Sequence, residues 1–184
     1  MAWSHKAGSG ATLPRVSLID LRRFRVRPGE LRQEHVDVPV EPFHLGGQRY
    51  ESHPVSVPVE LDASRASGAM VFDLRFETRL SGACMRCLGH AEVPIVVSAR
   101  EVHDLDGGGG DELRSDYVAD DRLDIGTWTR DAIALALPEQ ILCDPDCAGL
   151  CPVCGKDLNE EPHEHVEEGT DPRWEALREL RDDL

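Results

Sequence analysis

Six cysteines occur in three closely spaced pairs, and this pattern suits the binding of a metal ion. The first pair is Cys84 and Cys87, the second is Cys143 and Cys147, and the third is Cys151 and Cys154. Two histidines, His163 and His165, follow the third pair. Thiolate sulfur and imidazole nitrogen are the usual ligands of Zn²⁺, and a structural site takes four of them. These eight donors therefore predict one or two structural zinc ions.

The spacing leaves more than one way to share the donors between ions. One ion could take the second and third pairs, but only residues 148–150 separate these pairs, and zinc modules usually have a longer excursion there. We favour a first site that joins the first and second pairs and so fastens a sheet to the end of a long helix. The second site would then use the third pair with His163 and His165, as a small C-terminal knuckle.

Other chemistry fits the cysteines less well. A thioredoxin-like dithiol begins a helix in a βαβ unit, whereas Cys84 and Cys87 lie between two expected strands. Four protein ligands per ion also leave no open coordination position for a catalytic zinc. The sequence has no G-x-S-x-G, Walker, HExxH or dinucleotide-binding motif. We therefore expect a protein that is not an enzyme and has no catalytic residues.

The charge of the chain restricts its partners. Its 184 residues carry a formal net charge of -15, which argues against a surface that is basic throughout and binds nucleic acid by charge alone. A local RNA contact or a basic protein partner fits better. The main basic concentration lies near the N-terminus, and within it we predict four RNA-contacting arginines: Arg22, Arg23, Arg25 and Arg27. A solvated helix face is the alternative interpretation.

The cellular compartment of the protein also bears on the chemistry of its cysteines. No stretch is as long and apolar as a membrane span, and the first residues lack the apolar core of a signal peptide. The sequence therefore predicts a cytoplasmic protein with no membrane partner. In a reducing cytoplasm, clustered cysteines hold metal more often than they form disulfides.

The elements that must position the donors follow from the apolar periodicity. Residues 31–101 alternate apolar and polar side chains, which is typical of strands in an antiparallel meander. Residues 124–138 predict a long helix that is capped by Asp124, stopped by Pro138 and packed on the sheet. Residues 17–24 predict a short helix, and residues 101–124 a flexible solvated loop.

These elements predict an α+β fold in which an antiparallel β meander packs with a long helix and a C-terminal zinc-knuckle segment is appended. The expected organisation is a disordered lead at residues 1–13, an α+β domain at 14–142, and a cysteine- and histidine-rich zinc-binding segment with a helix at 143–184. Nothing in the pattern indicates an oligomeric state.

Five segments, taken in order, resemble the YceD family, which is associated with accumulation of large-subunit ribosomal RNA in bacteria and plastids. They are SLIDLRRFRVRPGE, CMRCL, DIGTWTRDAIALALP, CDPDCAGLCPVCGKDLNEEP and DPRWEALREL, and the resemblance covers about residues 14–182. Many members have C-x-C where this chain has His163 and His165, an exchange that zinc tolerates.

The resemblance implies a non-catalytic, zinc-stabilised factor in large ribosomal subunit biogenesis that supports 23S rRNA processing or accumulation. It implies large-subunit rRNA, a ribosomal protein, or both as partners. The alternative is an acidic escort that binds a basic ribosomal protein, which the net charge of the chain also fits.

Overall fold

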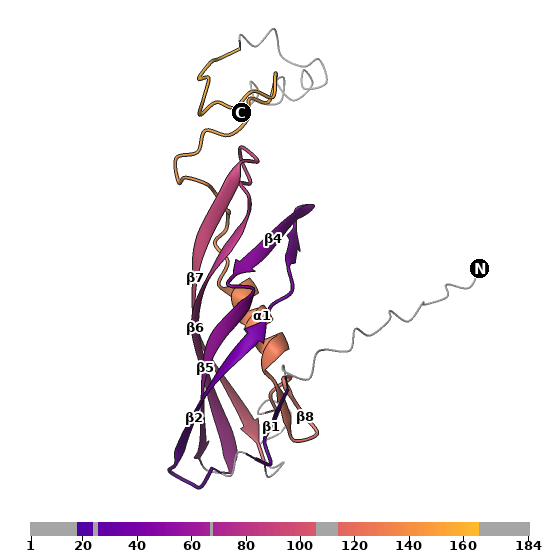
Figure 1. Cartoon of the computed structure of the whole chain (residues 1–184), viewed down its shortest axis with the longest axis vertical. Helices are drawn as coiled ribbons and strands as arrows, with labels where there is room; N and C mark the ends of the chain where they lie inside the picture. The colour runs from indigo at the N-terminus through magenta and orange to yellow at the C-terminus, as the bar shows by residue number, and fades with distance from the viewer. Residues whose placement is uncertain (1–17, 24–25, 67, 106–113, 166–184) are drawn as a thin grey trace, which may run out of the picture.

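The computed structural model describes residues 18–23, 26–66, 68–105 and 114–165 (Figure 1). The strands are β1 Leu18–Asp20, β2 Leu31–Pro39, β3 Phe43–Leu45, β4 Gln48–His53, β5 Ser56–Ala66, β6 Ala69–Ala83, β7 His90–Asp104, β8 Val118–Ala119 and β9 Arg122–Asp124, and the helix is α1 Ile125–Leu135. The expected disordered lead and the expected C-terminal helix lie outside the described residues.

Strand β6 is the centre of the main sheet. It pairs along its whole length with β7, from Ala69 opposite Asp104 to Ala83 opposite His90. On its other side it pairs first with β5 and then with β4. Strand β2 pairs with β5 and β3 pairs with β4 on this same side, so β7 forms the opposite edge. All of these pairings are antiparallel. A second, three-stranded sheet has the order β1-β9-β8.

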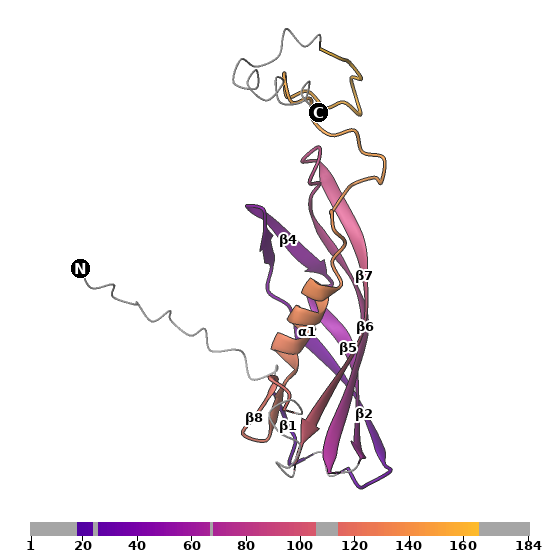
Figure 2. The same ribbon diagram turned by 180° about the vertical axis from the view of Figure 1, so that it is seen from behind.

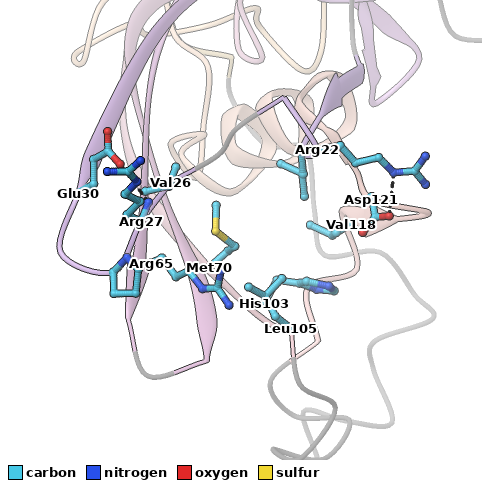
Figure 3. A pocket seen from close by; sticks show the side chains of 12 residues that line it. Arg22, Val26, Arg27, Glu30, Arg65, Met70, His103, Leu105, Val118 and Asp121 are labelled. Carbon is cyan, nitrogen blue, oxygen red and sulfur yellow. Dashed lines mark hydrogen bonds and ion pairs between the residues drawn. The ribbon is translucent and has the colours of Figure 1, made fainter.

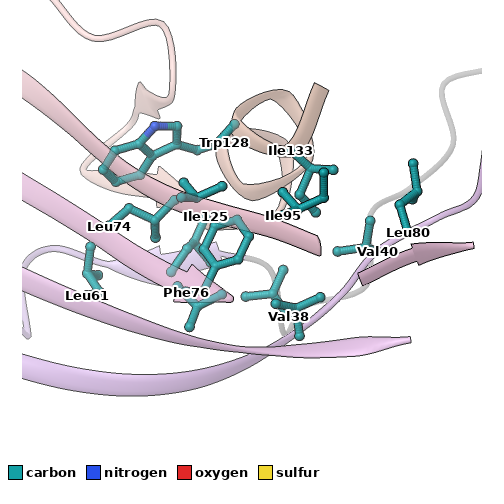
Figure 4. Close-up of a cluster of buried hydrophobic side chains, with 14 of the residues drawn as sticks. Val38, Val40, Leu61, Leu74, Phe76, Leu80, Ile95, Ile125, Trp128 and Ile133 are labelled. Atoms are coloured by element: carbon teal, nitrogen blue, oxygen red, sulfur yellow. The ribbon is translucent and has the colours of Figure 1, made fainter. Parts of the chain in front are cut away.

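The core lies between one face of the main sheet and α1. Met70, Phe72, Leu74, Phe76 and Leu80 alternate along β6 and are all buried. Helix α1 covers this face with Ile125, Trp128 and Ile133, which are buried as well (Figure 4). The alternating pattern in residues 69–80 therefore identified the buried side of the central strand.

The expected α+β class with a long helix is wrong, because the described residues form mostly antiparallel sheet and contain a single helix of 11 residues. Asp124 caps this helix as expected, and its Oδ1 accepts a hydrogen bond from the backbone N–H of Thr127 at 2.9 Å. The helix ends at Leu135, before Pro138, because a proline disfavours helical backbone at the residue before it. No helix in the described ranges is long and apolar enough to cross a membrane.

Two further segments differ from expectation. Residues 17–24 do not form a helix where they are described, because Leu18–Asp20 pairs with β9 instead and residues 21–23 form a turn. Tertiary pairing overrides the weak helical pattern of this short stretch. Residues 101–124 are not one loop, since β7 runs to Asp104 and β8 and β9 form a hairpin. The Gly run of this segment lies outside the described residues.

The β8–β9 hairpin turns on an unusual pair of residues. Asp120 and Asp121 both have positive φ, 50° and 57°. A two-residue hairpin turn of type I′ requires positive φ at both central positions, and asparagine, aspartate and glycine tolerate it best. The turn was missed because it contains neither glycine nor asparagine.

Gly82, near the end of β6, lies against the ring of Tyr50, and a Cβ at this position would overlap that ring. Tyr50 is 1% exposed, and its hydroxyl donates to the carbonyl of Ala83 at 2.8 Å, so the ring has little room to move. We expect Gly82→Ala to lower the free energy of unfolding by about 1–3 kcal/mol, the usual range for overpacking. Urea denaturation measures this change. The control is Glu77→Ala at an exposed position of the same strand, and equal stability of the two variants would contradict the prediction.

Candidate metal centres

The first and second cysteine pairs meet at the tip of the β6–β7 hairpin. Cys84 and Cys87 lie in the turn between the two strands, where the N–H of Cys84 donates to the carbonyl of Gly89 at 2.7 Å. Cys143 and Cys147 come from the segment after α1, which runs along the sheet to the hairpin tip (Figures 1 and 2). The Sγ atoms of Cys84 and Cys147 are 3.8 Å apart, and those of Cys87 and Cys143 are 3.6 Å apart. We call these four residues the first centre.

The geometry of the first centre suits a tetrahedral zinc ion. Zn–S bonds of about 2.3 Å place the sulfurs of a tetrahedral site about 3.8 Å apart, close to both measured separations. All four sulfurs lie within 4.8 Å of one another. Cys84 and Cys147 are buried, so one side of the site is shielded from solvent. The four residues could therefore hold one Zn²⁺ with little rearrangement.

The protein environment favours an ionised thiol at one position of the first centre. Burial opposes ionisation of Cys84, but hydrogen bonds from the backbone amides of Cys87, Arg86 and Cys143 outweigh it and lower its pKa to about 6. In contrast, hydrogen bonding with the Cys147 and Cys87 thiols raises the pKa of Cys143 to about 12. The sulfurs thus share protons when no cation lies between them, and a metal ion replaces those protons when it binds.

Backbone hydrogen bonds hold the second pair against the hairpin. The N–H of Met85 donates to the carbonyl of Ile141 at 2.9 Å, and the Arg86 guanidinium donates to the carbonyl of Cys147 at 3.0 Å. The backbone at Gly149 has φ of 79°, and a Cβ there would lie 3.2 Å from the carbonyl oxygen of Arg86. Glycine is required at this close approach, which explains the glycine between the second and third cysteine pairs.

The third pair and the two histidines form a second centre: Cys151, Cys154, His163 and His165, with donor atoms within 4.8 Å of one another. Sγ of Cys154 is 3.1 Å from Nε2 of His163. The Nδ1 of the same ring is 2.7 Å from the carbonyl oxygen of Glu161. A carbonyl only accepts, so Nδ1 carries the proton and Nε2 presents its lone pair to the site, as in most zinc-bound histidines.

The second centre is more exposed than the first. Cys154 and His165 are exposed, and only Cys151 is buried. Hydrogen bonds from the backbone amides of Cys154 and, to a smaller extent, Val153 lower the pKa of Cys151 to about 6. Hydrogen bonding to the Glu161 carbonyl and to Cys151 raises the pKa of His163. This mixed thiolate and imidazole set also suits a tetrahedral zinc ion.

Asn159 connects the two centres. Its Oδ1 accepts from the N–H of Ala148 at 2.8 Å, and its Nδ2 donates to Sγ of Cys147 at 3.5 Å. A hydrogen bond to a ligating thiolate orients the ligand and spreads its charge. The loop that carries the second centre therefore completes the surroundings of the first. Sequence reasoning missed Asn159 and Arg86, because neither is a ligand and their contacts depend on the fold.

The eight donors thus come together in the two groups of four that the sequence analysis favoured. The alternative group of the second and third pairs does not form. That these groups bind zinc remains a prediction, which the donor types and distances support.

Three of the four arginines predicted to contact RNA lie in the described residues, and two of them, Arg22 and Arg27, line the same cavity. Arg22 pairs with Asp121 at 3.0 Å, and Arg23 lies 3.7 Å from Asp20. Arg25 lies outside the described residues. Arg27 is exposed and lines the cavity. Its side chain forms no ion pair with any of the described residues. The arginines that the structure describes therefore divide between paired and unpaired side chains.

The fold and the two centres define an antiparallel β protein whose C-terminal segment is fastened to a hairpin tip by clustered thiolate and imidazole donors. A family model described as "Large ribosomal RNA subunit accumulation protein YceD" matches residues 72–181, a range that contains all eight donors. The chain belongs to this family.

Similar proteins occur in several bacteria. An uncharacterized protein of Mycobacterium tuberculosis is 32% identical over 179 residues, which cover 83% of this chain and 86% of that protein. A protein of Mycobacterium bovis gives the same values. The uncharacterized protein YlbN of Bacillus subtilis is 30% identical over 131 residues, which cover 69% of this chain and 74% of YlbN. No solved structure matches the chain.

We expect the full-length chain to carry two zinc ions, and Cys84→Ser and Cys151→Ser each to remove one of them, since a hydroxyl is a poor substitute for a thiolate. The Cys84 variant should also show the larger fall in melting temperature, because the first centre joins segments that are 63 residues apart. Elemental analysis and thermal denaturation measure these effects. If each single variant loses both ions, the prediction of two separate centres is wrong.

Asn159→Ala is expected to weaken zinc binding at the first centre roughly tenfold, although Asn159 is not a ligand. Competition with a chromophoric chelator measures the affinity of each centre. Glu160→Ala, at the next exposed position, is the matched control and should leave the affinity unchanged. If both variants release zinc as the wild type does, the hydrogen bond to Cys147 has no role in binding.

Proposed function

We propose that this protein is a non-catalytic, zinc-stabilised factor that supports the processing or accumulation of 23S rRNA in the large ribosomal subunit. The observation that carries the proposal is the match to the family model, which spans both four-donor centres. The description of the family names accumulation of large-subunit ribosomal RNA. The proposed place of action is the cytoplasm.

The donor sets support a structural role for the metal. Each centre supplies four ligands, which fills a tetrahedral ion and leaves no position for an activated water. The first centre also joins segments that are distant in the sequence, since Cys87 and Cys143 are 56 residues apart. In this proposal the metal fixes the shape of the protein, and the function resides on its surfaces.

The charge of the chain supports a second candidate, an acidic escort for a basic ribosomal protein. A net charge of -15 attracts a basic partner over a long range, and added salt weakens this attraction. RNA would instead require a local cationic surface on this acidic protein.

Crosslinking in cells tests the two candidates together. The tagged full-length chain is irradiated in cells and purified under denaturing conditions, and its bound RNA is sequenced; in parallel, native complexes are treated with RNase and their proteins identified. We expect enrichment of large-subunit over small-subunit rRNA, with an untagged strain as the control. A basic ribosomal protein that stays bound after RNase and leaves at high salt would instead favour the escort. Loss of the protein should lower 23S relative to 16S rRNA, and an unchanged ratio would contradict the proposed function.

A further inference from the structure

A cavity of about 740 Å³ opens at the end of the main sheet that lies away from the metal centres (Figures 1 and 3). It is formed by the β1–β2 connection, the ends of β5 and β7, the start of β6, and the β8–β9 hairpin. Its size is in the range of pockets that bind small organic ligands. The sequence analysis placed Arg27 at an RNA contact and Met70 on the buried side of its strand, whereas Arg65 and His103 were not predicted to belong to a site.

Two arginines at this cavity have no carboxylate partner among the residues that the structure describes. They are Arg27, which is exposed, and Arg65, which is half-buried at the end of β5. Most other described arginines of this acidic chain are ion-paired, as between Arg49 and Glu51 and between Arg100 and Asp73. A partly desolvated guanidinium with no anion is costly, and an external anion would offset that cost.

The acidic side chains of the cavity are already engaged. Glu30 Oε2 accepts a hydrogen bond from the backbone N–H of Arg27 at 3.0 Å. Asp121 pairs with Arg22 at 3.0 Å, across the cavity from Arg65 (Figure 3). Neither carboxylate forms an ion pair with Arg65 in the described part of the chain. The lining contains Arg22, Arg27 and Arg65 against Glu30 and Asp121, so the cavity keeps a local positive charge on a protein that is negative as a whole.

The remaining side chains that line the cavity are mostly apolar, with one aromatic ring. Met70, Leu105 and Val118 contribute hydrophobic surface, and His103 adds an aromatic ring. Leu105 is 42% exposed, so this surface is accessible from solvent. Unstacked RNA bases bind to apolar and aromatic side chains and to guanidinium planes, while their phosphates bind arginine.

We propose that this cavity binds a nucleotide of single-stranded RNA, with the base on Leu105 and His103 and the phosphate on Arg27 and Arg65. The inference rests on the proposed function, because it supplies the local cationic surface that RNA binding requires. Single-stranded RNA is the favoured occupant because a duplex keeps its bases stacked and offers the cavity only phosphates. An acidic peptide would satisfy the arginines but leave the apolar lining exposed.

Fluorescence anisotropy with a labelled single-stranded RNA of mixed sequence tests the site, using the zinc-loaded full-length chain. We expect Arg65→Ala to weaken binding and to lower the slope of log affinity against log salt by about 0.7, the value for one lost phosphate contact on a single strand. Leu105→Glu should weaken binding about tenfold or more by removing base contact and adding charge. Thermal denaturation verifies that each variant is folded.

The matched controls make the same chemical changes elsewhere. Arg49→Ala removes an exposed arginine of β4, and Leu135→Glu adds a charge at a leucine that is 87% exposed at the end of α1. Both should bind RNA as the wild type does. If the wild type binds RNA and neither Arg65→Ala nor Leu105→Glu changes its affinity, the cavity is not the RNA site. The proposed function would still stand in that case. Equal or tighter binding of duplex RNA, or of an acidic peptide of the same length, would also overturn the cavity as a site for single-stranded RNA. No binding of the wild type to large-subunit rRNA at all would instead remove the RNA contact on which the inference rests.

Discussion

Four sulfur atoms within 4.8 Å of one another cannot all carry charge unless a cation lies between them. At about 4 Å, each pair of like charges repels by roughly 4 kcal/mol even at an effective dielectric constant of 20. The hairpin tip and the segment after α1 meet at this point, with only a few backbone hydrogen bonds between them. In the proposed zinc-bound state, a cation between the sulfurs would turn this repulsion into attraction and fasten the C-terminal segment to the hairpin tip.

We propose different roles for the two ends of the main sheet. The metal centres lie at the tip of the β6–β7 hairpin, and the cationic cavity lies at the opposite end of the same strands (Figure 2). Strand β6 has 15 residues and spans about 50 Å at 3.3 Å per residue. A ligand in the cavity therefore does not touch the metal ligands. In our proposal the sheet separates the end that metal would stabilise from the end that would bind RNA.

Sequence patterns predicted what depends on local spacing. The buried face of β6 and the cap at Asp124 follow from periodicity and residue type, and the donor groups follow from the short gaps between cysteine pairs. The patterns failed where distant segments decide the outcome. Leu18–Asp20 became a strand because β9 lies beside it, and Asp120 and Asp121 form a hairpin turn without glycine. The contacts of Asn159, and the lack of a carboxylate partner for Arg65 among the described residues, arise only once the chain has folded, so no local pattern predicts them.

The separation of the first centre along the chain has a consequence during synthesis. Cys84 leaves the ribosome 63 residues before Cys147, its neighbour in the folded protein. At about 5–20 residues per second, the early thiols wait several seconds for their partners. During this interval neither thiol of the hairpin tip has the other two donors of the first centre beside it. The proposed zinc ion can therefore complete its coordination only after Cys147 has been synthesised, late in translation of the chain.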